Sequence, residues 1–308
     1  MQSAFAEELP YSREYTEEQI NLIYESLKDE SKLFPVQYDF RIKVDKNDLS
    51  ITEGLSPDWN NILLMGTDTG NKSLNYGRTD AMMVLSVNKK SGELKLTSLA
   101  RDMYVPIAGT NIHNRINAAN AFGGPLLTVK TVNAVLGLNI RQYASINFAG
   151  FENVVDALGG VDIELSQAEA NIVGVAKEEG RQSLNGEQAL KYVRIRKLDN
   201  NFGRNERQRI FLVSLLNKMK HSGLDVALES LSIALQQMST NLSVSDILPL
   251  VPKIIGNKND MHLLSLPESG DWRYAAKKDM SVVVFDEEST KAAFHSFVYG
   301  EDAEQAAM

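Results

Sequence analysis

Several residue types that support common kinds of protein chemistry are absent or scarce in this chain of 308 residues. It has no cysteine, which excludes disulfides and thiol catalysis. Its four histidines include no pair at the spacing of zinc ligands, so we do not expect a zinc site. Apolar runs are short, such as Ile62–Met65, and none is long enough to span a bilayer. The first residues, MQSAFAEELPYS, show no intact signal peptide, and we interpret them either as the remnant of a trimmed export segment or as a polar tail.

Acidic residues outnumber basic ones by 40 to 32, which gives a formal net charge of −8. This balance argues against a general affinity for nucleic acids or anionic membranes. Positive charge is nevertheless concentrated in one segment. It holds five of the chain's thirteen arginines within sixteen residues: Arg194, Arg196, Arg204, Arg207 and Arg209. Either these arginines bind an anionic ligand, or nearby carboxylates such as Asp199 and Glu206 neutralise them.

Strand-like and helix-like segments alternate along the chain. Short apolar runs predict three strands, at 61–68, 81–88 and 93–100. The turn-forming KKSG between the last two predicts a β-hairpin. Helical spacing and start signals predict three helices, at 125–136, 185–196 and 204–220. We therefore predict an α/β fold with a central mixed β-sheet sandwiched by helices.

The chain shows no internal repeat and no low-complexity linker, although its length allows one domain or two. We predict an N-terminal extension over residues 1–55, with a helix near 16–28. A single domain follows over residues 56–300, and a short tail over 301–308 ends the chain.

Charged side chains gather where the predicted strands begin and end. Asp68 follows the first strand, Arg78 and Asp80 precede the second, and Arg101 and Asp102 follow the third. In a hairpin, the start of one strand neighbours the end of the other. These residues therefore share one sheet edge if the first strand also runs antiparallel to the second. Surface salt bridges at strand ends are the alternative interpretation.

The helix predicted at 204–220 adds basic and amide groups to this set. Arg204, Arg207 and Gln208 stand at positions i, i+3 and i+4, so their side chains share one face. Arg209 points elsewhere, and we expect it in solvent. Arginine binds phosphate oxygens through two parallel hydrogen bonds, and Mg²⁺ takes carboxylates together with substrate phosphates. Arginines beside aspartates therefore indicate a metal-assisted diphosphate site.

Six sequence pieces occur in a specific order within the part of the chain, roughly residues 58–300, that the resemblance below covers: GRTDAMMV, SLARDMYVPI, RINAANAFGG, FENVVDALGGVDIEL, LNGEQALKYVRIR and DNNFGRNERQR. Together they resemble the LytR-CpsA-Psr family. The resemblance implies an Mg²⁺-dependent phosphotransferase on the outer face of the cytoplasmic membrane of a Gram-positive-type bacterium. Such a protein moves a secondary wall glycopolymer, for example teichoic acid or capsule, from a polyprenyl diphosphate to peptidoglycan. It also implies an apolar lipid pocket and a membrane anchor that this chain does not include.

The resemblance also assigns roles to individual residues. The implied metal ligands are Asp68 and Asp80. The implied catalytic residues are Arg78, Asp80, Arg101 and Asp102. The implied diphosphate ligands are Arg78, Arg101, Arg115, Arg194, Arg196, Arg204 and Gln208.

Three other functions remain open from the sequence. A polyprenyl diphosphate phosphatase would use the same site with water as the nucleophile. Asn201 stands where the family often has an aspartate, which motivates a non-catalytic lipid-binding or polymer-binding wall protein. A nucleic-acid binder is suggested only by the arginine segment, and the acidic net charge argues against it.

Overall fold

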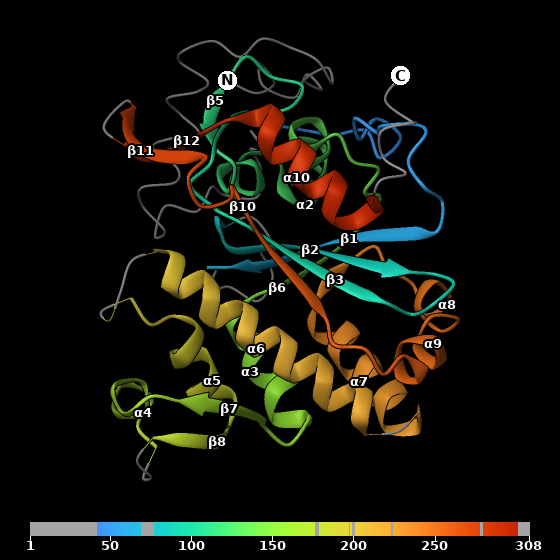
Figure 1. Cartoon of the computed structure of the whole chain (residues 1–308), viewed down its shortest axis with the longest axis vertical. Coiled ribbons are helices and arrows are strands. Elements are labelled where there is room, and N and C mark those ends of the chain that lie inside the picture. Colours follow the sequence, from blue (N-terminus) through green and yellow to red (C-terminus); the bar gives the residue numbers. More distant parts are fainter. Residues whose placement is uncertain are drawn as a thin grey trace, which may run out of the picture.

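The computed structural model describes residues 42–68, 77–175, 179–196, 198, 201–222, 224–277 and 280–300 (Figure 1). The helix expected near 16–28, the tail over 301–308 and the side chain of Asn201 lie outside the described part. Asp199 lies outside it as well. Within these ranges, no helix is both long enough and apolar enough to cross a membrane.

A six-stranded sheet forms the centre of the molecule, with the strand order β10-β3-β2-β1-β6-β9. Its strands are β1 (Trp59–Thr67), β2 (Thr79–Asn88), β3 (Leu94–Leu99), β6 (Gln142–Ile146), β9 (Ser239–Thr240) and β10 (His262–Leu266). Strand β2 is antiparallel to both β1 and β3, whereas β6 is parallel to β1 and β10 is parallel to β3. The sheet is mixed, as the sequence predicted.

The predicted hairpin is formed by β2 and β3. In its turn, the side chain of Asn88 accepts hydrogen bonds from the backbone N–H groups of Lys90 (2.9 Å) and Ser91 (3.0 Å). Gly92 has a φ of +72°, and a Cβ atom there would lie 2.2 Å from the carbonyl oxygen of Lys253. Only glycine meets both demands, so the turn chemistry fixes the register of the hairpin.

Helices cover both faces of the sheet (Figure 1). On one face lie α2 (Ala118–Leu136) and α10 (Glu287–Tyr299). On the other face lie α3 (Phe148–Ala157), α6 (Asn201–His221) and α7 (Leu224–Gln237), with α5 (Gly186–Val193) and α4 (Gln167–Val173) beyond them. Two short helices complete the set, α8 (Val244–Ile247) and α9 (Val251–Gly256).

Three two-stranded sheets lie outside the central one. They pair β4 (Tyr104–Pro106) with β5 (His113–Arg115), β7 (Val161–Leu165) with β8 (Gly180–Leu184), and β11 (Trp272–Lys277) with β12 (Met280–Phe285). The β11–β12 hairpin projects from the molecule near β5 (Figure 1). It also contacts the segment after β3, through a parallel bridge between Met103 and Val283.

Two of the three predicted helix starts are confirmed, whereas the helix predicted from 204 begins at Asn201. Helix α2 is kinked at Gly123 and Gly124, and its second part begins at Pro125, the predicted start. Helix α5 begins with a capping box in which Asn185 and Gln188 each bond the other's backbone N–H. These local signals fix where α5 and the second part of α2 begin.

Two apolar cores lie on opposite faces of the central sheet. The larger core packs α2 and α10 against the sheet, and Ile42 and Leu49 from the described part of the extension are buried in it. The second core joins α3, α5 and α6 with the β7–β8 sheet, and includes Phe211 and Leu215 of α6. The second core therefore holds α6 next to the sheet edge where the charged residues were expected.

Candidate active site

An irregularity in the pairing of β1 and β2 exposes Asp80. Gly66 pairs with Ala81 and Thr67 pairs with Thr79, so Asp80 has no partner on β1. This is a β-bulge, which leaves one residue unpaired and redirects its side chain. The backbone carbonyl of Asp80 is thereby free to accept hydrogen bonds from other elements.

The strand ends meet as the hairpin register predicts. Strand β2 is antiparallel to both of its neighbours, so the end of β1, the start of β2 and the end of β3 lie at one edge. The backbone N–H of Asp68 donates to the carbonyl of Arg78 at 3.2 Å. Arg101 follows β3, and its Nη1 forms a close ion pair with Oδ1 of Asp80. The sequence therefore placed these four residues correctly.

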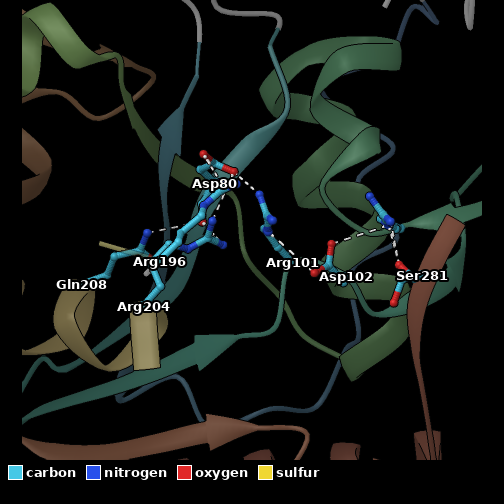
Figure 2. Close-up of polar contacts among 8 residues, drawn as sticks. Asp80, Arg101, Asp102, Arg196, Arg204, Gln208 and Ser281 are labelled. Atoms are coloured by element: carbon cyan, nitrogen blue, oxygen red, sulfur yellow. Dashed lines mark hydrogen bonds and ion pairs between the residues drawn. The ribbon is translucent and has the colours of Figure 1, made fainter. Parts of the chain in front are cut away.

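Three further side chains reach Asp80 from α6 and from the segment before it (Figure 2). The Nη2 of Arg204 and the Nε2 of Gln208 donate to the carbonyl oxygen of Asp80, at 3.5 Å and 3.4 Å. Arg204 Nη1 also lies 3.8 Å from Oδ1 of Asp80. Arg196 is more exposed and donates from Nη2 to Oδ2 of Asp80 at 3.4 Å. Three guanidinium groups thus surround one carboxylate.

Part of this positive charge is buried and incompletely bonded. The side chain of Arg204 is only 1% exposed. Burial, together with the nearby charge of Arg101, lowers the pKa of Arg204 to about 10, although Asp80 acts in the opposite direction. Within the described residues, Nε and Nη1 of Arg204 and Nε of Arg101 have no hydrogen-bond partner. Buried donors are usually hydrogen-bonded, so these nitrogens are suited to the oxygens of a bound anion.

A pocket of about 170 Å³ adjoins these groups. The polar part of its lining includes Asp80, Arg194, Arg196, Arg204 and Gln208, together with Thr67 and Asn147. The rest of the lining is mostly apolar and comes from β1, β2 and β6 of the sheet and from α3, α5 and α6. The pocket therefore combines a long apolar wall with a cluster of cationic groups.

Two arginines expected at the diphosphate have other partners. Nε and Nη2 of Arg115 donate to the carbonyl oxygen of Ser281 at 2.9 Å and 2.6 Å (Figure 2). Arg115 Nε also lies 3.5 Å from Oδ1 of Asp102, and Arg115 does not line the pocket. The guanidinium of Arg194 lies over the ring of Phe148, with 4.3 Å between its Cζ and the ring centroid. Arg194 does line the pocket, so its cation–π contact holds it at the pocket wall.

The three side chains that were predicted to share one face of α6, Arg204, Arg207 and Gln208, have different partners. Arg204 and Gln208 point to Asp80, but Arg207 Nε donates to Oε1 of Glu169 at 2.7 Å. The expectation that Arg209 is solvated is wrong. Its side chain is only 16% exposed, forms an ion pair with Glu206 and donates to Oγ of Ser265 at 2.6 Å. Arg207 and Arg209 are thus used to pack α6 against its neighbours.

Asp102 differs from Asp80 in its surroundings. Its side chain is 9% exposed and lies between Nε of Arg101, at 3.7 Å, and Nε of Arg115, at 3.5 Å. It does not line the pocket. Sequence reasoning missed two partners of the charged residues, Phe148 and Ser281. No local signal marks them, because Phe148 lies 46 positions before Arg194 in the chain and Ser281 lies 166 positions after Arg115.

The arrangement can accommodate Mg²⁺ with help from a substrate. Among the described residues, no three histidine, aspartate or glutamate side chains gather closely enough to hold a metal on their own. Asp68 and Asp80 stand at the same sheet edge and offer carboxylate oxygens. Mg²⁺ is often held by one or two carboxylates plus substrate phosphates, and the unpaired arginine donors beside Asp80 suit such phosphates.

Comparison with known proteins places this geometry in a wider context. The model of the LytR_cpsA_psr family matches residues 22–294. The chain is 34% identical over 220 residues to the polyisoprenyl-teichoic acid–peptidoglycan teichoic acid transferase TagU of Oceanobacillus iheyensis. The aligned region covers 68% of each chain. It is 32% identical over 254 residues to TagU of Bacillus anthracis, covering 78% of this chain and 83% of that one.

Solved structures agree with this match. The chain superposes on Bacillus subtilis TagV with a TM-score of 0.66 and 27% identity, covering 80% of this chain and 99% of TagV. It also superposes on the LytR-CPS2A-psr family protein YwtF (TagT), solved with bound octaprenyl pyrophosphate lipid, with a TM-score of 0.61 and 26% identity. That match covers 79% of this chain and 91% of YwtF. The chain belongs to the LytR_cpsA_psr family.

Proposed function

We propose that this protein transfers a wall glycopolymer from a polyprenyl diphosphate carrier to peptidoglycan. The observation that carries the proposal is the set of buried, unpaired donors on Arg101 and Arg204 beside an apolar pocket. A polyprenyl diphosphate has a matching division into an anionic head and an apolar chain. The names of the TagU relatives and the lipid bound to YwtF support the same chemistry.

The head and the chain of the donor occupy different parts of the site. Arg101, Arg196 and Arg204 hold the diphosphate oxygens, and the amide of Gln208 keeps the backbone of Asp80 in place. The prenyl chain lies in the apolar part of the pocket, between the sheet and the helices on that face. The part of the prenyl chain that is bound there loses its contact with water, which favours binding through the hydrophobic effect.

The reaction is a substitution at the phosphorus atom next to the polymer. A hydroxyl of peptidoglycan attacks this atom and releases its proton to solvent, and the polyprenyl phosphate leaves with the electrons of the broken P–O bond. The arginines stabilise the negative charge that develops on the phosphoryl oxygens. Of Asp80 and Asp102, only Asp80 lines the pocket, so Asp80 is the carboxylate that faces the reacting groups.

A magnesium ion fits this scheme. Asp68 and Asp80 would hold it, and it would supply charge stabilisation for the diphosphate. Peptidoglycan lies outside the cytoplasmic membrane. The proposed site of action is therefore the outer face of the cytoplasmic membrane or the cell wall.

The test is a transfer assay with the purified protein, Mg²⁺, peptidoglycan and a labelled disaccharide linked to octaprenyl diphosphate. We expect label on peptidoglycan and release of octaprenyl phosphate, both lost in Asp80→Ala and after chelation of the metal. Thermal unfolding of Asp80→Ala checks that the variant is folded.

Three results would contradict the proposal or part of it. Release of octaprenyl phosphate with the label free in solution would indicate a diphosphatase, with water as the nucleophile. Full transfer by Asp80→Ala would show that Asp80 is not needed for the reaction. Binding of the donor without any product would favour a non-catalytic lipid-binding wall protein.

A further inference from the structure

The segment that carries Arg101 is held between two other parts of the chain. It runs over residues 101–103, directly after β3. On one side, the backbone N–H of Ile116 donates to the carbonyl of Met103 at 2.8 Å. On the other side, the backbone N–H of Val283 in β12 donates to the carbonyl of Asp102 at 2.8 Å. The position of Arg101 therefore depends on both flanks.

The side chain of Arg115 joins these two flanks. Arg115 is the last residue of β5, and its Nε and Nη2 both donate to the carbonyl oxygen of Ser281 in β12. The same guanidinium faces Asp102, with 3.5 Å between Nε and Oδ1. Arg115 thus contacts both the backbone of the β11–β12 hairpin and the carboxylate of Asp102.

Asp102 continues the chain of contacts toward the active site (Figure 2). Its Oδ2 lies 3.7 Å from Nε of Arg101, whose Nη1 contacts Asp80. The sequence of charges from Asp80 through Arg101 and Asp102 to Arg115 alternates in sign. Asp102 is largely buried, so its charge is shared between the two arginines rather than screened by water.

We propose that Arg115 is a positioning residue that neutralises Asp102 and so leaves Arg101 directed at Asp80 and the substrate. Without the charge of Arg115, Asp102 attracts Arg101 more strongly and draws its guanidinium away from Asp80. This inference rests on the proposed function, because it takes Arg101 as a ligand of the diphosphate. It replaces a direct role of Arg115 at the diphosphate, because the guanidinium of Arg115 is bound to Ser281 and faces Asp102 rather than Asp80.

The decisive variant is Arg115→Gln, because glutamine keeps a donor for Ser281 but removes the charge. We expect its kcat for transfer of the octaprenyl-diphosphate disaccharide to fall about tenfold, within the range of coupling between contacting charges. Its Kd for octaprenyl diphosphate should weaken less than in Arg204→Lys, because the diphosphate loses only its contact with Arg101. In the background of Asp102→Asn, Arg115→Gln should have no further effect on kcat. Arg181→Gln is the matched control, since Arg181 pairs with Asp162 at 3.4 Å far from the site.

A second readout does not require activity. The NMR signal of the Arg101 Nε–H, assigned by its loss in Arg101→Lys, should shift in Arg115→Gln and in Asp102→Asn but not in Arg181→Gln. An unmoved signal would overturn the inference, even if the wild type shows no transfer and the proposed function fails. A Kd for octaprenyl diphosphate weakened as much as in Arg204→Lys would overturn it as well, since it would make Arg115 a direct ligand. Equal kcat losses with and without Asp102 would contradict the route through Asp102.

Discussion

At the scale of single residues, Arg204 and Arg209 show how differently one helix uses the same side chain. Arg204 is buried beside Asp80 with two of its nitrogens unpaired, whereas Arg209 is tied to Glu206 and Ser265. The nitrogens of Arg204 that have no hydrogen-bond partner among the described residues can bind an anion. The bonds of Arg209 stabilise the contact between α6 and β10.

We predict that Arg204→Lys reduces turnover of the octaprenyl-diphosphate donor at least tenfold, about 1.4 kcal/mol of transition-state stabilisation. Lysine keeps the charge but loses the fork that binds two phosphate oxygens. Arg209→Lys is the control and should leave kcat unchanged, with any loss appearing in the melting temperature. Steady-state kinetics and thermal unfolding on the three proteins make the comparison. Equal sensitivity of kcat at Arg209 would contradict the assignment of the helix faces.

The sequence predicted the positions of those charged side chains that local geometry sets. It failed for side chains whose positions depend on partners from distant segments. The hairpin register brought Asp80 and Arg101 together, and helical spacing paired Arg204 with Gln208. Spacing alone could not separate Arg207 from these two residues, because its partner Glu169 comes from another helix. The bulge that exposes Asp80 also leaves no clear mark in the sequence.

At the scale of secondary-structure elements, the contact between α4 and α6 fixes the helix that carries Arg204. Glu169 and Arg207 are both largely buried and 2.7 Å apart. Burial alone would raise the pKa of Glu169. Hydrogen bonds from Ser166 and Arg207 outweigh it, so the pKa of Glu169 lies below its ordinary value of 4.5.

We predict that Glu169→Gln lowers the free energy of unfolding at pH 7 by about 2–3 kcal/mol, because it leaves a buried guanidinium without this carboxylate. The folded state favours the charged form of Glu169, so its contribution is complete above pH 4.5 and is lost as the pH falls through the lowered pKa. The difference between wild type and variant should therefore shrink in acid. Denaturant unfolding from pH 7 downward measures it. Glu187→Gln, which breaks an exposed pair with Lys191, should change stability little at any pH.

The packing of α5 on α3 offers a second test at this scale. A Cβ atom on Gly186 would lie 2.4 Å from the carbonyl oxygen of Glu152. The two helices are therefore so close at this position that only glycine fits without a shift of the backbone. We predict that Gly186→Ala destabilises the protein by about 1–3 kcal/mol, because the backbone must shift. Gly256→Ala, at a helix position with open space around it, should be neutral or slightly stabilising. Denaturant unfolding compares the two, and a neutral Gly186→Ala would show that α5 moves freely.

At the scale of the whole molecule, the α/β class and the mixed sheet could be predicted because alternating elements leave few layered arrangements. The strand order β10-β3-β2-β1-β6-β9 could not, since β9 and β10 are short strands that join the sheet from far along the chain. The resemblance implied an apolar pocket, but the residues that line it could not be predicted. It lies between the sheet and helices that follow it in sequence, so its lining combines segments that no local pattern connects.

The pocket allows the two parts of the donor to be tested separately. Ala144 of β6 lines the apolar part, opposite Leu64 in the parallel register. We predict that Ala144→Phe fills this space and abolishes binding of octaprenyl diphosphate, while inorganic diphosphate still binds at the arginines. A ligand at a hundredfold excess over its Kd stabilises the folded state by about 2.7 kcal/mol, so thermal shifts report both events. Arg204→Lys is the complementary variant and should weaken both ligands. If Ala144→Phe binds octaprenyl diphosphate as tightly as the wild type does, the prenyl chain does not lie in this pocket, whereas loss of both ligands would mean that the substitution disturbs the arginine cluster as well.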